Sequence, residues 1–315
     1  MTTLTDTKAT TRAMLQVLAA MAPGALASVW FFGIGVLTNL LIALIACAGF
    51  ESLALHLRKQ NVRAGLGDCS AFITGSIIAL ALPPIIPLWL LITACGVAIL
   101  LAKHASGGFG RNVFNPAMAG YAYALIIFPA AFTHWPQMLS GSVDGVTGAT
   151  ALDVFKQNRA DLVSDWWRAH AAFGHFGGAG WEWINLLFLA GGIYLLRQKI
   201  IQWYAPVNAL LAIVALSLMF YDGGSSSSGG SPLMHLLSGG TLLGIFFVVT
   251  EPVTLPSSKC AQTAYGALIG TLIFCIRHWG GYADGIAFAV LFGNAAAPLL
   301  DRLCAADFFE RLHQQ

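Results

Sequence analysis

Residues 144–150, with the sequence DGVTGAT, form the stretch of this chain best suited to receive a chemical modification. Thr150 follows Gly148 and Ala149, whose small side chains leave its hydroxyl on a thin backbone that another enzyme's active site can accept. A threonine hydroxyl is a poor nucleophile until a base or a metal activates it, and no nearby residues form an evident catalytic set. We therefore interpret Thr150 as an acceptor and predict no catalytic residue. From the local chemistry alone, an ordinary Gly/Thr turn is the simpler alternative.

The segment GGFGRNVFNPAMAG, at residues 107–120, is a candidate for binding. Arg111 lies at a predicted membrane boundary, Asn112 and Asn115 follow it, and Pro116 breaks the local helix. A broken helix end exposes free N–H groups that can hold an anion or a polar ligand. The alternative is that Arg111 anchors the chain at the membrane surface and that the Gly and Asn residues serve close helix packing.

Three acids, Asp68, Glu251 and Asp284, fall at the ends of predicted membrane spans. Acids inside a membrane domain are functional candidates by default, but water at the interface is the simpler explanation for these positions. Asp68, Glu251 and Arg111 are predicted on one side of the membrane, which leaves an ion pair among them open. The six cysteines lie far apart without C-x-x-C spacing, so we interpret them as buried small hydrophobes and predict neither a metal site nor a disulfide.

Composition identifies the elements that must position these residues. The 315 residues are 57% hydrophobic and 10% charged, with a mean hydropathy of +0.73. Soluble domains carry about 25% charged residues, so most of this chain must face lipid or other helices. A net charge of +2 does not indicate a nucleic-acid partner. The polar N-terminal stretch, which ends at Arg12, is not followed by a cleavable signal pattern. We therefore expect the first spans to direct insertion into the bilayer.

The hydropathy pattern predicts an all-α integral membrane protein with about ten transmembrane helices. The predicted spans are residues 20–37, 38–57, 68–84, 85–102, 113–132, 182–198, 204–221, 233–250, 263–279 and 282–300. Pro83, Pro84 and Pro87 separate the third and fourth spans, which predicts a tight turn at a membrane face. An even number of spans leaves both termini on one side.

Basic residues set the predicted orientation. With cytoplasmic termini, 12 of the 16 Lys and Arg residues are inside and only Lys156, Arg159, Arg168 and Arg277 are outside, in agreement with the positive-inside rule. The loop 133–181, which carries DGVTGAT, then lies outside the cytoplasm. It joins two five-span halves, residues 1–132 and 182–315.

A faint internal similarity relates the two halves. TGSIIALALPP at 74–84 resembles GGTLLGIFFVVTEP at 239–252, and GGFGRNVF at 107–114 resembles GGYADGIA at 280–287. A repeat of five spans is inverted in the membrane, an architecture that places ligand sites at the interface between the repeats. Chance similarity between Gly-rich apolar segments is the alternative.

DGVTGAT resembles the flavinylation motif of the NqrB/RnfD family of membrane electron-transfer subunits. Further segments resemble the same family in the same order, so the resemblance covers nearly the whole chain. They are GDCSAFITGSIIALALPP at 67–84, SGGFGRNVFNPAMAGYAYAL at 106–125, HLLSGGTLLGIFFVVTEPVT at 235–254 and YGALIGTLIFCIRHWGGYADGIAFAVLFGNAAAPLLD at 265–301. The short polar tail before the first span is more similar to the RnfD branch, because the NqrB branch carries a longer extension associated with quinone.

The resemblance implies that a flavin transferase attaches FMN to Thr150 through a phosphoester, using FAD and a divalent metal. Asp144, Gly145, Gly148 and Ala149 would form the sequence that the transferase reads, and Thr147 is the competing acceptor. Some relatives hold a second, non-covalent flavin, riboflavin, for which the region of Arg111, Asn112 and Asn115 is a candidate. The tryptophans in or near the outer loop predict an interfacial belt, with stacking on a flavin as the alternative; they are Trp135, Trp166, Trp167, Trp181 and Trp183.

The implied function is that of an FMN-carrying electron-transfer subunit of an ion-translocating Rnf-type complex in the bacterial inner membrane. Such a complex links ferredoxin and NAD chemistry to ion movement. This chain has no NAD site and no Fe–S cysteine pattern, so other subunits would supply them. Two alternatives are an NqrB-type subunit of a Na⁺-translocating quinone reductase and a small-solute channel. A channel has no reason to carry DGVTGAT in an outer loop.

Overall fold

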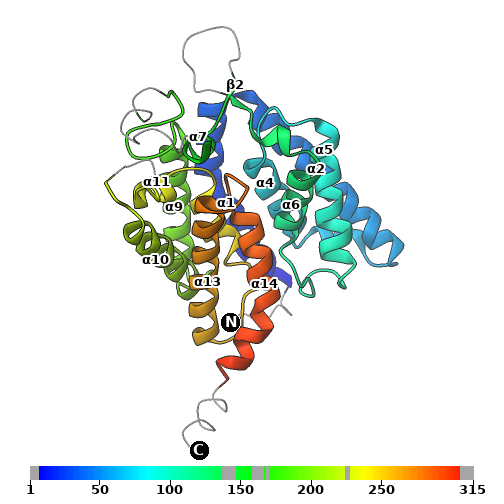
Figure 1. Ribbon diagram of the computed structural model, residues 1–315. Helices are drawn as coiled ribbons and strands as arrows, with labels where there is room; N and C mark the ends of the chain where they lie inside the picture. Colours follow the sequence, from blue (N-terminus) through cyan, green and yellow to red (C-terminus); the bar gives the residue numbers. More distant parts are fainter. Residues whose placement is uncertain (1–6, 137–146, 158–166, 168–169, 224–227, 306–315) are drawn as a thin grey trace, which may run out of the picture.

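The computed structural model describes residues 7–136, 147–157, 167, 170–223 and 228–305, and most of these are helical (Figure 1). The N-terminal half holds α1 (Thr7–Phe32), α2 (Ile34–Leu57), α3 (Val62–Leu66), α4 (Ser70–Ala81), α5 (Leu88–Gly96) with its π-helical continuation η1 (Val97–His104), and α6 (Pro116–Ile127). The connection between the halves contains η2 (Pro129–Phe132), β1 (Trp135–Pro136), β2 (Thr147–Gly148) and α7 (Ala151–Gln157). The C-terminal half holds α9 (Trp181–Arg197), α10 (Tyr204–Met219), α11 (Pro232–Leu236), α12 (Thr241–Leu243), η3 (Gly244–Val248), α13 (Lys259–His278) and α14 (Ile286–Leu303).

Each of the ten predicted spans coincides with helical structure, and an all-α membrane protein is confirmed. The first predicted boundary, at residue 37, is wrong: α1 begins at Thr7 and ends at Phe32, because Gly33 adopts a φ of 84° that interrupts the helix. The turn predicted at Pro83, Pro84 and Pro87 is confirmed between α4 and α5. Within the described residues, four helices are long and apolar enough to cross a bilayer alone: Lys8–Phe32, Ile34–Leu57, Lys259–His278 and Ile286–Leu303.

Other spans are too short to cross a bilayer as single helices. Helices α4 and α6 have 12 residues each, which corresponds to about 18 Å of helix against a hydrocarbon core of about 30 Å. The eighth span is divided into α11, α12 and η3. Irregular backbone at membrane depth is tolerated only when it is buried in protein or lines a cavity. The short and broken spans must therefore lie inside the bundle.

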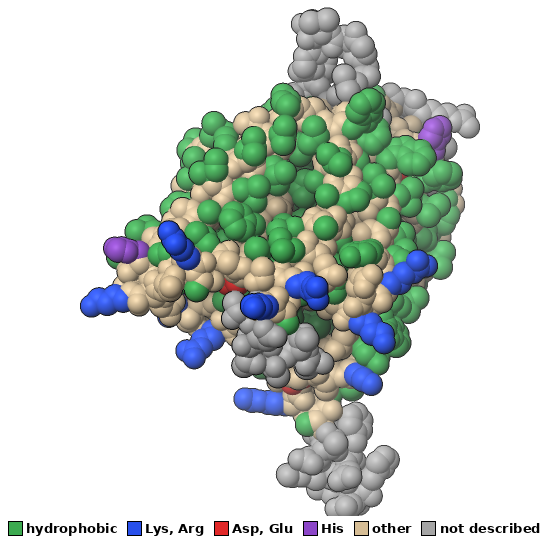
Figure 2. All heavy atoms as spheres, turned by 180° about the vertical axis from the view of Figure 1, so that it is seen from behind, with side chains coloured by type: hydrophobic (Ala, Val, Ile, Leu, Met, Phe, Trp, Pro, Cys, Tyr) green, Lys and Arg blue, Asp and Glu red, His purple; other side chains and the backbone are tan. Residues whose placement is uncertain are grey.

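The two ends of the bundle differ in charge. The start of α1 and the end of α14 lie at one end, whereas β2 and α7 lie at the other (Figure 1). Figure 2 shows an apolar surface over most of one face, with Lys and Arg side chains gathered along the margin nearest the chain ends. Large apolar side chains such as Trp30, Ile45 and Met219 are exposed, as a lipid-facing surface requires.

Matching contacts in the two halves agree with the predicted inverted repeat. The first helices of the two halves, α1 and α9, pack together, and so do the last, α6 and α14. Lys103 and His104 end the fourth span, and its counterpart α13 ends in Arg277 and His278. Lys103 Nζ donates to the hydroxyl of Ser70 at 2.7 Å, at the start of α4. On the other half, Arg277 Nη2 donates to the hydroxyl of Thr241 at 2.8 Å, at the start of α12.

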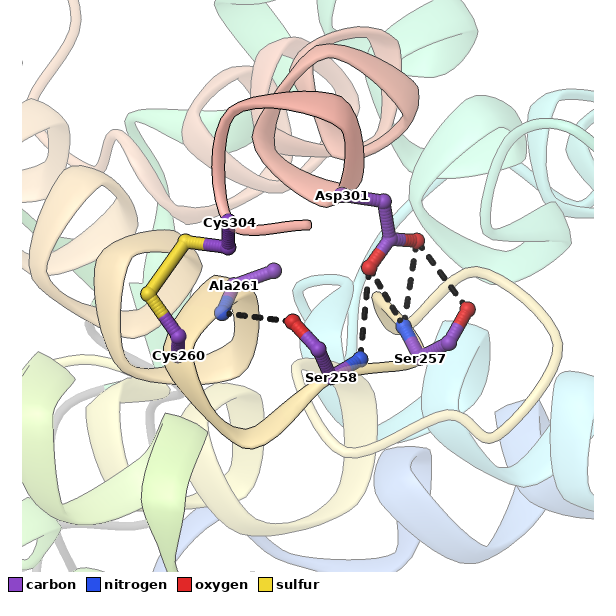
Figure 3. Close-up of a disulfide and its surroundings, with 6 residues drawn as sticks. All are labelled: Ser257, Ser258, Cys260, Ala261, Asp301 and Cys304. Carbon is purple, nitrogen blue, oxygen red and sulfur yellow. Dashed lines mark hydrogen bonds between the residues drawn. A yellow bond between two sulfur atoms is a disulfide. The ribbon is translucent and has the colours of Figure 1, made fainter. Parts of the chain in front are cut away.

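A cysteine pair joins α13 to α14 at the end of the bundle that holds the chain ends. Cys260 and Cys304 form a disulfide beside Asp301, whose carboxylate accepts the backbone N–H groups of Ser257 at 2.9 Å and Ser258 at 3.2 Å (Figure 3). The prediction that all six cysteines are unpaired is wrong for these two. They are 44 positions apart, and only the antiparallel packing of the two helices brings them together.

Glycines allow α13 to pack closely against α10. A Cβ atom on Gly266 would overlap the carbonyl oxygen of Ala205. Membrane helices use such small residues to bring their backbones together, since dispersion contacts replace the hydrophobic effect in lipid. The α10–α13 contact therefore depends on the absence of a side chain at this position.

We expect Gly266→Ala to lower the stability of the protein by about 1–3 kcal/mol, because the added methyl group forces the two helices apart. Thermal unfolding in detergent measures the effect. Gly49→Ala is the matched control, since a Cβ atom at Gly49 meets nothing within 4 Å. Equal melting temperatures for the two variants would contradict this account of the contact.

Candidate functional site

Thr150 is the N-cap of α7. Its hydroxyl donates to Asp153 Oδ2 at 2.6 Å, and its backbone N–H donates to the same oxygen at 3.1 Å. The backbone N–H of Asp153 returns a bond of 3.2 Å to the Thr150 hydroxyl oxygen. This reciprocal arrangement satisfies N–H groups that a helix start leaves without a partner. Asp153 was not recognised from the sequence, although its spacing of three residues from Thr150 is the signal of such a cap.

The rest of the motif leads into this cap. Gly148 pairs with Trp135 and Thr147 with Pro136 in the short antiparallel β1–β2 ladder. Ala149 is exposed, and Thr150 is half-buried. Asp144 and Gly145, the other predicted motif residues, lie outside the described part of the chain.

Helix α7 is fixed to the membrane domain through its lysine. Lys156 Nζ donates to the carbonyl oxygens of Ile276 at 3.0 Å, Arg277 at 3.3 Å and Tyr282 at 2.7 Å. Two of these carbonyls belong to the last turn of α13, where a helix leaves acceptors without partners. Leu152 and Phe155 of α7 are buried in a small apolar cluster. Thr150 is thus held against the C-terminal half.

Thr150 and Asp153 lie at a cavity of about 370 Å³ between the two halves of the protein. Residues of α4, α6, α12, η3 and α14 line it, and its walls are mostly apolar. The aromatic lining residues are Tyr121, Phe132, Trp135, Trp181 and Tyr282. Ligand sites typically combine about 300–1,000 Å³ of mostly apolar space with a few polar groups. The cavity therefore has the size and the chemistry of a site for an aromatic ligand.

Aromatic side chains of the cavity wall pack against one another. Trp135 and Trp181 have ring centroids 5.0 Å apart, and both contact Phe32. Trp181 is buried, so its predicted place in an interfacial belt is wrong, whereas Trp183 is 56% exposed and fits that prediction. Trp166 lies outside the described residues.

Two carboxyl groups and the ammonium group of Lys156 are the charged groups in the cavity lining. Asp284 pairs with the buried guanidinium of Arg277 at 3.0 Å, and Asp153 faces the same space. Burial raises the pKa of Asp153, hydrogen bonds from Thr150 oppose the rise, and the charge of Asp284 adds to it. The polar end of the cavity thus combines a hydroxyl with a carboxyl group that accepts protons more readily than an exposed aspartate.

The second predicted site has a different organisation from the one expected. Asn115 caps α6, with Pro116 as its first residue, so the predicted break is confirmed. Asn112 and Asn115 donate to the two carboxylate oxygens of Glu251 at 3.0 and 2.8 Å. Arg111 is exposed, and within the described residues no ion pair joins it to either Glu251 or Asp68.

A further buried cluster was missed from the sequence. Glu51 pairs with Lys103 at 2.9 Å and with His104 at 3.0 Å, with all three side chains buried. An acid in the middle of an apolar span was the available signal. Among the residues that the structure describes, no group of three His, Cys, Asp or Glu side chains has the geometry of a metal site.

Comparisons with known proteins agree with this architecture. A sequence model of the NQR2, RnfD, RnfE family matches residues 2–310. The chain is 48% identical to the D subunit of the ion-translocating oxidoreductase complex of Cellvibrio japonicus, over 93% of this chain and 88% of the relative. The corresponding proteins of Ectopseudomonas mendocina and Salmonella paratyphi B are 46% and 41% identical, over 93% of this chain and 89% and 92% of theirs. The chain therefore belongs to the NQR2, RnfD, RnfE family and is a membrane subunit of an ion-translocating oxidoreductase complex.

Proposed function

We propose that this subunit carries FMN on Thr150 through a phosphoester and transfers electrons within an Rnf-type complex. The observation that carries the proposal is the position of the Thr150 hydroxyl at the polar end of an aromatic cavity between the two halves. A covalent tether at this point keeps a bound group beside the cavity. Tethering also raises the effective concentration of the group near its partners.

The residues of the cavity fit the flavin ring system. Tyr121, Trp135 and Trp181 offer flat apolar surfaces, and aromatic rings prefer offset or edge-to-face contacts with one another. The cofactor supplies one- or two-electron redox chemistry, and the protein positions it and sets its electrostatics. The apolar walls would exclude water, while Asp284 and the buried Arg277 would fix the charge near the ring.

The remaining functions belong to partners in this proposal. Other Rnf-type subunits would bind NAD, ferredoxin and the Fe–S clusters, and a flavin transferase would modify Thr150. The chain would lie in the bacterial inner membrane, with its termini in the cytoplasm and α7 on the outer side. The basic margin near the chain ends supports this orientation through the positive-inside rule.

We expect wild-type protein, co-expressed with a flavin transferase, to give a fluorescent band on a denaturing gel. Thr150→Val should abolish this signal, because valine has no hydroxyl to esterify. Thr147→Val should retain it and serves as the matched control. A dark wild-type band beside an active transferase would refute the proposed attachment.

Gly240 allows the ring site to be tested separately from the attachment. It lines the cavity, a Cβ atom there meets nothing within 4 Å, and its φ of −84° suits other residues. We expect Gly240→Leu to retain covalent flavin but to fill the space for the ring. Quenching of flavin fluorescence by iodide should then rise toward the value for free FMN. Gly49→Leu controls for added bulk, and equal quenching in both variants would place the ring elsewhere.

A further inference from the structure

We propose that Asp153 accepts the proton of the Thr150 hydroxyl when the flavin phosphoester is formed. The inference rests on the proposed attachment of FMN to Thr150. It assigns part of the chemistry of attachment to the acceptor protein itself, rather than to the transferase alone.

The geometry around the hydroxyl carries the proposal. Thr150 Oγ1 and Asp153 Oδ2 are 2.6 Å apart, within the range expected for proton transfer to a general base. The backbone N–H of Thr150 binds the same carboxylate oxygen at 3.1 Å, which fixes the orientation of the carboxylate. The N–H of Asp153 occupies one acceptor site on the hydroxyl oxygen. A hydroxyl has two lone pairs, so one is left for bond formation.

The step balances without any redox change. The Thr150 oxygen attacks the FMN phosphorus of FAD, the bridging bond of the pyrophosphate breaks, and AMP leaves with the bridging oxygen. The hydroxyl proton passes to Asp153 and then to solvent. Because a threonine hydroxyl is a weak nucleophile without an adjacent base, the position of Asp153 supplies what the motif alone lacks.

Charged and titratable groups around Asp153 come from several elements. Asp284 precedes α14 and pairs with Arg277 of α13, Lys156 lies on α7 itself, and Tyr121 of α6 lines the same cavity. Burial, followed by the charge of Asp284, raises the pKa of Asp153, while Thr150 and Lys156 oppose the rise. A higher pKa makes a carboxylate a stronger proton acceptor. The acceptor form is lost as pH falls through this raised pKa, so attachment should slow at a higher pH than for an ordinary aspartate.

The alternative is that Asp153 only caps α7. Asp153→Asn separates the two roles, because the amide oxygen still accepts the cap bonds but is not a base. The experiment measures the initial rate of flavin attachment to purified, full-length protein with transferase, FAD and Mg²⁺ across a pH series. Asp301→Asn is the matched control, since Asp301 also accepts backbone N–H groups but lies at the opposite end of the bundle. The pH profiles of the variant and the control are compared directly: a pH dependence that persists in Asp153→Asn belongs to the transferase, and the difference between the two profiles reports Asp153.

We expect Asp153→Asn to slow attachment by about 10²–10⁴-fold, the usual contribution of a general base, and to lose the fall in rate at low pH. A rate within about threefold of the control, or a slower rate with an unchanged pH profile, would overturn the proposal.

Asp153→Glu retains a carboxylate and should keep the pH dependence at a reduced rate. A folded glutamate variant whose attachment rate does not depend on pH would also overturn the proposal. Amide hydrogen exchange over residues 151–157 reports whether α7 has opened. Failure of wild-type attachment is a separate result and would refute the proposed function itself.

Discussion

The structure depends on one requirement of the bilayer: a helix that breaks at membrane depth must satisfy its free backbone groups within the protein. The break before α12 illustrates how this is done. Asn185 of α9 donates to the carbonyl oxygen of Gly239 at 2.8 Å and accepts the N–H of Leu242 at 2.9 Å. Arg277 donates to the carbonyl oxygen of His235 at 2.7 Å. These buried side chains replace the hydrogen bonds that a continuous helix would make to itself.

The same requirement produces the cavity. Gly239 and Gly240, at the break, line it, and Arg277, which satisfies the break, also holds Asp284 at its polar end. Lys156 of α7 donates to two backbone carbonyls in the last turn of α13. Thr150 is therefore positioned through α7 by backbone carbonyls at and just beyond the end of the ninth span.

The sequence predicted features that depend on local composition. Apolar length placed the spans, the prolines at 83, 84 and 87 placed a turn, and Pro116 placed a break in the fifth span. The pairing of Glu51 with Lys103 and the disulfide of Cys260 with Cys304 could not be predicted, because each joins helices distant in sequence. The inverted repeat predicted a ligand site at the interface between the halves, but not which residues line the cavity, since its walls come from both halves.

The capping bond at Thr150 has opposite consequences before and after modification. Before it, the hydroxyl donates to Asp153; this bond orders the first turn of α7 and, in the proposed reaction, would prepare the oxygen for attack. An esterified oxygen has no proton to donate, and a phosphodiester anion beside a carboxylate is unfavourable in a buried site. Asp153 would then keep only the backbone N–H of Thr150 and would hold its proton to a higher pH. The proposed attachment thus changes the electrostatics at one end of the cavity in the same step that places the cofactor beside it.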